Sequence, residues 1–215
     1  MDNARIPAMH PEFGIFEPVF ESAHGYLALL GLSSGDATEA VKFVRNCCGK
    51  VSKPSSDICR LLAESNWRPH LVAAVAMIVS GFDAEAASLL WRRLDCGSWV
   101  TPQIAAALFL VDPDFPAQAR ARLEARCPVD TTELRSMSPI ERHSATGPAG
   151  TVHRSAKAAA ALLQLAGMAS PIPPWVQEIR AAKDMQALLA QDIDGSDKIA
   201  ERWLNRIREI TAETD

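Results

Sequence analysis

The apolar residues of this 215-residue chain recur at helical spacing, and no stretch alternates apolar and polar residues as a half-buried strand does. Alanine and leucine together contribute 55 residues, whereas valine, isoleucine and threonine contribute 32. Because the first pair favours helices and the β-branched residues favour strands, an all-α fold with no sheet is predicted. With 48% hydrophobic residues, the chain is long enough to bury one sizeable core. We therefore expect a single domain over residues 1–215.

Capping and turn residues divide the chain into about ten helices. Asp83 is a plausible N-cap, Pro102 suits a first helical position, and Gly31 and Gly81 suit helix ends. The expected helices begin near residue 17, 36, 54, 67, 84, 101, 115, 152, 175 and 196. The last two form a C-terminal helical pair over residues 175–213. Residues 128–151 lack apolar periodicity and are predicted to form a long loop.

Two of these helical segments resemble each other at an offset of 32 residues. Segment 67–80 aligns with segment 99–112, and the matched residues are Trp67 with Trp99, Ala73-Ala74 with Ala105-Ala106, and Val79 with Val111. Each segment has small alanines early and large aliphatic residues late, and a shorter amphipathic helix precedes it. A hairpin of this kind cannot bury both of its faces alone, so neighbouring hairpins are expected to stack.

Residues 54–127 resemble the HEAT-like and armadillo-like helical repeats. The residues that carry the resemblance are the paired segments 54–81 and 83–111 and the half-repeat 113–127. The resemblance implies stacked antiparallel helical hairpins, a HEAT-like α-solenoid whose concave face binds a partner. The loop 128–151 departs from the repeat pattern, because it separates the two helices of the third hairpin.

Charge is distributed unevenly along the chain, although the formal net charge is only −4 and the isoelectric point is about 5.8. This balance argues against a protein that mainly holds nucleic-acid backbone. Residues 1–40 carry six acidic side chains and one basic side chain. Five of these acids are candidate contacts for a basic partner protein: Glu12, Glu17, Glu21, Asp36 and Glu39.

A second set of candidate contact residues lies in and just after the predicted loop. This set consists of Arg135, Arg142, His143 and Arg154, with Lys157 close behind. Long irregular loops on a compact scaffold are commonly either functional or disordered. Basic side chains there suit an acidic partner or a phosphate group.

Motifs for catalysis and metal binding are mostly absent from the sequence. It has no Gly-rich phosphate loop, no Gly-x-Ser-x-Gly and no His-Glu-x-x-His. The spacing of Glu21 and His24 matches half of a di-iron pair, and Asp112 with Asp114 is more simply explained by a helix cap. We therefore expect no catalytic residues, no metal and no cofactor.

The five cysteines and five tryptophans are expected to be structural. No cysteine spacing matches a zinc site, and Cys47-Cys48 is poorly placed for a disulfide, so reduced, buried thiols are predicted. The helical spacing of the tryptophans favours the core, although tryptophan is also a common interface anchor. The N-terminus has no apolar core of signal-peptide length, no apolar run is long enough for a membrane span, and the chain is predicted to be cytoplasmic.

These observations favour a binding protein without chemistry of its own. One concrete version, typical of small bacterial helical proteins, is an immunity protein whose acidic surface neutralises a cytosolic toxin. The alternatives are a HEAT-like DNA-binding repair enzyme of the DNA glycosylase type, against which the isoelectric point argues, and an adaptor subunit of a larger assembly. The first and last rest on fold-level analogy.

Overall fold

The computed structural model describes residues 13–21, 25–33, 35–132 and 150–214. Within these ranges the chain forms twelve α-helices and one 3-10 helix, and no strand, which confirms the all-α prediction. The number of helices exceeds the expected ten. The elements are η1 (Gly14–Phe16), α1 (Glu17–Glu21), α2 (Gly25–Gly31), α3 (Asp36–Cys48), α4 (Ser55–Ala63), α5 (Trp67–Ser80), α6 (Ala84–Asp95), α7 (Thr101–Val111), α8 (Phe115–Glu124), α11 (Thr151–Gly167), α12 (Trp175–Ala181), α13 (Lys183–Leu189) and α14 (Ser196–Thr214).

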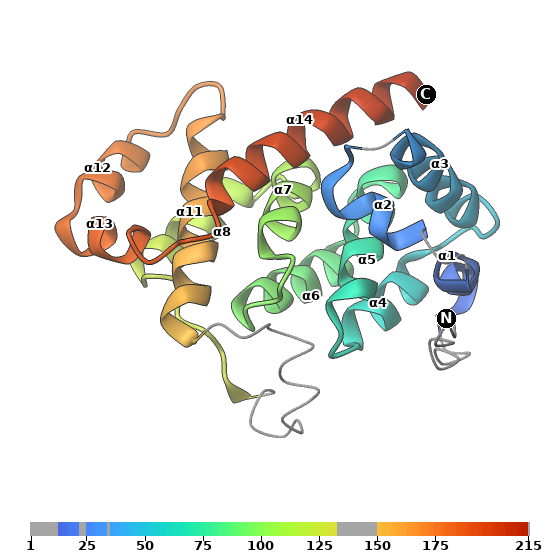
Figure 1. Cartoon of the computed structure of the whole chain (residues 1–215), viewed down its shortest axis with the longest axis horizontal. Coiled ribbons are helices and arrows are strands. Elements are labelled where there is room, and N and C mark those ends of the chain that lie inside the picture. Colours follow the sequence, from blue (N-terminus) through green and yellow to red (C-terminus); the bar gives the residue numbers. More distant parts are fainter. Residues whose placement is uncertain (1–12, 22–24, 34, 133–149, 215) are drawn as a thin grey trace, which may run out of the picture.

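Helices α5 and α7 form the centre of the core and pack against each other (Figure 1). Both are apolar around most of their circumference, which is typical of a helix buried on all sides. The paired alanines that suggested a repeat, Ala73-Ala74 and Ala105-Ala106, are fully buried in these two helices. Small side chains let the neighbouring helices approach closely, and α4 and α6 pack on the outside of α5 and α7.

The long helix α14 lies across other helices rather than closing one end of the molecule. Figure 1 shows it running from α11 past α7 toward α3, and it packs against all three. Its amphipathic pattern explains this position, because one stripe of the helix is fully or almost fully buried. That stripe consists of Ala200, Trp203, Leu204, Ile207 and Ile210.

The C-terminal part contains three helices, so the predicted helical pair over residues 175–213 is wrong. The expected helix over 175–191 is interrupted at Ala182, whose backbone is extended (φ −65°, ψ 129°) and which separates α12 from α13. The expected helix near residue 17 is represented by α1 and α2, with residues 22–24 outside the described ranges. In the predicted loop 128–151, residues 133–149 also lie outside them.

The remaining expectations about element ends and thiols are borne out in part. Asp83 caps α6 as predicted, because its carboxylate accepts a hydrogen bond from the backbone N–H of Ala86 (3.0 Å). All five cysteines are free, and four of them are buried. No helix in the described ranges is long and apolar enough to cross a lipid bilayer.

Candidate functional site

A cavity of the described structure, called here the central pocket, opens between α2, α7, α11 and α14. It has a volume of about 660 Å³, within the range of small-molecule and side-chain binding sites. Most of its wall surface is apolar, and four charged side chains also line it. It is lined by Leu30, Gly31, Leu32, Ser33, Trp99, Pro102, Gln103, Lys157, Asp194, Ile199, Arg202, Trp203 and Arg206.

The floor of the pocket is fixed by side chains that bind the carbonyl groups at the end of α2. The last carbonyls of a helix lack partners within the helix and must bind other donors when they are buried. Here the indole of Trp203 donates to Leu29 O (2.9 Å), and the amide of Gln103 donates to Leu30 O (3.0 Å). The guanidinium of Arg206 donates to Leu32 O (3.1 Å). Donors from α7 and α14 therefore hold α2 in place.

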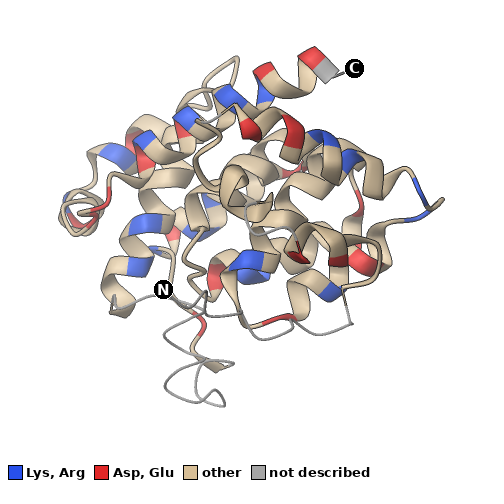
Figure 2. Cartoon of the chain, turned by 45° about the vertical axis from the view of Figure 1, so that its right-hand side comes forward, with Lys and Arg blue, Asp and Glu red and all other residues tan. Residues whose placement is uncertain are grey.

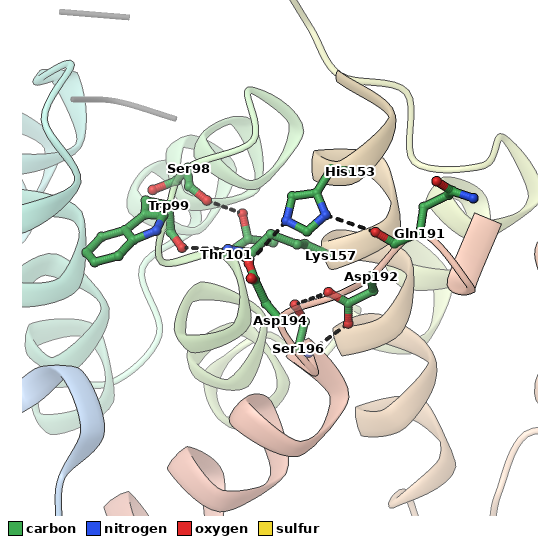
Figure 3. A network of polar contacts seen from close by, with 9 residues as sticks. All are labelled: Ser98, Trp99, Thr101, His153, Lys157, Gln191, Asp192, Asp194 and Ser196. Atoms are coloured by element: carbon green, nitrogen blue, oxygen red, sulfur yellow. Dashed lines mark hydrogen bonds and ion pairs between the residues drawn. The ribbon is translucent and has the colours of Figure 1, made fainter. Parts of the chain in front are cut away.

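A buried lysine forms one wall of the pocket. Lys157 lies on α11 and is only 7% exposed, and its ammonium donates to the carboxylate of Asp194 (3.1 Å) and to the backbone oxygen of Trp99 (3.3 Å). Figure 3 shows the ammonium between these two groups. His153, one turn earlier on α11, contacts the same carboxylate (3.1 Å) and the backbone oxygen of Gln191 (2.9 Å). Buried charge is tolerated when it is paired in this way.

A tight turn before α14 places Asp194 against α11. The carboxylate of Asp192 accepts hydrogen bonds from the backbone N–H (2.7 Å) and the hydroxyl (2.9 Å) of Ser196, the first residue of α14 (Figure 3). Gly195 has a φ of +67°, which glycine adopts more readily than other residues. The local sequence thus builds the turn, and the turn presents Asp194 to Lys157 and His153.

The electrostatic state of Asp194 follows from these contacts. Partial burial would raise the pKa of its carboxyl group, because burial disfavours the charged form. Hydrogen bonds from Lys157 and His153, with their positive charge, act in the opposite direction and prevail, so the pKa lies below its usual value. Asp194 is therefore a carboxylate at neutral pH, and its charge is matched by Lys157.

Three exposed apolar residues lie on the segments that carry this network, and we call them the Trp99 surface: Trp99, Val152 and Ile193. They are 42%, 59% and 85% exposed. Trp99 also lines the pocket, and Val152 and Ile193 directly precede His153 and Asp194 in the sequence. A large exposed aromatic side chain beside a pocket is a candidate anchor for a protein contact.

The acidic residues proposed from the sequence lie on a different part of the molecule. Glu17 and Glu21 are on α1, Asp36 and Glu39 are on α3, and these two helices pack together. Glu39 forms an ion pair with Lys42 (3.0 Å). Figure 2 shows acidic and basic residues interspersed over the helices.

The other predicted contact residues are either buried or outside the described ranges. Arg154 is 9% exposed, and its side chain packs against Gly97 so closely that a Cβ atom there would lie 2.7 Å from the arginine Cδ. Glu12, Arg135, Arg142 and His143 lie outside the described residues. Of the second predicted set, only Arg154 is therefore placed by the described structure, and it is buried.

Two polar residues near helix ends, His70 and Asp112, have structural contacts. His70 is buried between the carbonyl of Glu64 (2.8 Å) and the hydroxyl of Ser98 (3.1 Å). Asp112 accepts hydrogen bonds from the Trp91 indole (2.6 Å) and from the backbone N–H of Asp114 (2.8 Å). The carboxylate that caps this turn is thus that of Asp112, whereas Asp114, expected as the cap, makes no side-chain cap bond to α8.

No group of three or more histidine, cysteine, aspartate or glutamate residues suited to a metal ion occurs in the described ranges.

The sequence analysis identified Lys157 but missed most of the residues that line the pocket. Arg202 and Arg206, four residues apart beside the apolar stripe of α14, were a readable signal for a cationic edge. Asp194 and Trp99 had no such signal, because their positions depend on contacts between distant segments.

Comparisons with protein-family models, with curated proteins and with solved structures gave no match.

Proposed function

We propose that this protein is a non-catalytic protein-binding module and that the Trp99 surface is its contact site. The observation that supports the proposal is the exposure of Trp99, which lines the central pocket, and of Val152 and Ile193, which directly precede the ion-paired residues His153 and Asp194. Tryptophan beside a pocket is a frequent anchor of binding energy. The packing of α4 on α6 and of α5 on α7 also supports HEAT-like stacked hairpins as the scaffold.

The experiment is a quantitative pull-down of the full-length protein from the source cells, with variants of single exposed residues. Trp99→Ser and Ile193→Ser are expected to reduce recovery of a stoichiometric partner at least tenfold, because large apolar contacts are lost. Ile172→Ser is the matched control, since Ile172 is 50% exposed just beyond the opposite end of α11. Equal recovery with all three variants would exclude the Trp99 surface as the contact site.

A second candidate function uses a different contact site. It is an immunity protein that binds a basic, cytosolic toxin through its acidic helices α1 and α3. The support is the exposure of Glu21 and Asp36 on these packed helices. Charge reversal by Glu21→Lys with Asp36→Lys is expected to abolish recovery of such a partner and to leave a partner of the Trp99 surface bound. Salt-sensitive binding of duplex DNA instead of a protein would contradict both candidate functions.

A further inference from the structure

We propose that the central pocket binds a small amphipathic carboxylate, a molecule with one carboxylate group and an apolar body. This inference goes beyond the protein contact, because it concerns the interior of the pocket and not the Trp99 surface at its mouth. Two observations carry it: the apolar wall and one positive charge without a matching carboxylate.

The wall suits an aliphatic or aromatic body. Leu30, Pro102, Ile199 and Trp203 contribute apolar surface from three different helices. The helices that form the wall pack on one another through buried side chains such as Leu29, Ile104 and Leu204. The pocket therefore exists without a ligand to hold it open. Transfer of an apolar chain from water into such a space is favourable in proportion to the area that is covered.

The charges of the lining do not balance. Three cations line the pocket, and two of them already have a carboxylate partner: Lys157 pairs with Asp194 (3.1 Å), and Arg206 pairs with Glu209 (2.7 Å). Arg202 donates through Nε to the carbonyl of Lys198 (3.2 Å), and within the described part of the chain no carboxylate pairs with it. One net positive charge therefore remains at the pocket.

A single carboxylate satisfies this arrangement better than a neutral or a cationic ligand. The guanidinium of Arg202 offers N–H groups in a planar fork, the geometry that a carboxylate matches with two hydrogen bonds. Asp194 does not oppose such a ligand strongly, because its carboxylate is already paired with the ammonium of Lys157. A cation would meet the unmatched arginine and is disfavoured.

The experiment is calorimetric titration of the full-length protein with octanoate and, separately, with 1-octanol, which has the same chain but no charge. Octanoate is expected to bind at one site about tenfold more tightly than 1-octanol, the difference that one charge-assisted hydrogen bond supplies. Arg202→Gln is expected to weaken octanoate binding about tenfold and to leave 1-octanol binding unchanged. Ile199→Trp, which fills the pocket, is expected to abolish binding of both.

Arg208→Gln is the matched control, because Arg208 lies on the same helix but packs over Phe109 and does not line the pocket. The proposal is overturned if octanoate shows no saturable binding, if 1-octanol binds as tightly, or if Arg208→Gln has the same effect as Arg202→Gln. These results are distinguishable from the protein contact, since the Ile193→Ser pull-down tests that contact at a residue that does not line the pocket.

Discussion

Several buried polar side chains in the described core bind defined backbone groups. His70, Lys157 and Gln103 each bind backbone carbonyls that no helix or sheet satisfies. Arg93 likewise donates to the carbonyls of Leu62 and Ala63 at the end of α4. A buried polar group without a hydrogen bond lowers the stability of the fold by about 1–3 kcal/mol. The role of these side chains is therefore to stabilise helix ends.

His70 makes the stability of the protein depend on pH. Burial, and secondarily the nearby charge of Arg93, lowers the pKa of His70 to about 3 from 6.5. Its Nε2 faces a carbonyl, which only accepts, so this nitrogen carries the hydrogen and Nδ1 accepts from Ser98 in a neutral ring. Below pH 6.5 the unfolded chain takes up a proton that the folded chain refuses, and stability falls as the pH decreases.

We expect this linkage to remove about 2 kcal/mol of unfolding free energy between pH 7 and pH 5. Urea unfolding at a series of pH values measures the change. His70→Gln is expected to be less stable at pH 7 but to show a flatter dependence over the same interval. An unchanged slope in the variant would assign the pH dependence to other groups.

The pairing of Lys157 with Asp194 predicts unequal effects of the two possible truncations. Asp194→Ala leaves a buried ammonium without its carboxylate and is expected to cost about 1–2 kcal/mol, below the usual loss for a fully buried pair because Asp194 is partly exposed. Lys157→Met leaves an exposed carboxylate that water can solvate, and is expected to cost less.

The double variant Lys157→Met/Asp194→Ala separates pairing from packing. It is expected to be more stable than Asp194→Ala alone, because no unpaired buried charge remains. Thermal or urea unfolding of the four proteins gives the coupling energy. Additive losses would indicate that the two side chains do not interact appreciably.

Helix α14 has one buried face and one exposed face. Ile207 is fully buried, whereas Asn205 on the same helix is exposed. Ile207→Ala is expected to lower the unfolding free energy by about 2–4 kcal/mol through lost burial and a residual cavity. Asn205→Ala is expected to change it by less than about 0.5 kcal/mol. Similar losses for both, measured by urea unfolding, would contradict this packing.

The sequence predicts individual helices better than their arrangement. The limits of α5 and α7 agree with the predicted segments 67–80 and 101–111, because apolar periodicity and caps are local signals. The break at Ala182 was missed, since neither glycine nor proline marks it. The central pocket was not predictable for a different reason: Trp203 and Leu29, which meet at its floor, are 174 residues apart.

At the scale of the whole molecule, α14 joins helices from the beginning and the middle of the described chain. Helix α14 packs on α3, α7 and α11, and Trp203 and Arg206 bind the carbonyls of Leu29 and Leu32. In an open repeat array each unit contacts only its neighbours, so unfolding can begin at an end. Here the loss of α14 also uncovers α7 in the centre of the core.

We therefore expect one cooperative unfolding transition. Denaturation followed by tryptophan fluorescence and by far-ultraviolet circular dichroism is expected to give the same midpoint, because no group of helices unfolds alone. Separate midpoints, or early hydrogen exchange confined to α3 and α4, would instead indicate a repeat array that frays from one end.

The position of α14 also has a consequence for synthesis on the ribosome. The helices that α14 covers are translated before it, and residues leave the ribosome at about 5–20 per second. Until α14 emerges, α7 and α11 each have an apolar side that is exposed to water. The carbonyls of Leu29 and Leu32 then also lack the donors that Trp203 and Arg206 provide. The nascent chain therefore exposes apolar surface that favours aggregation and chaperone binding until α14 has been made.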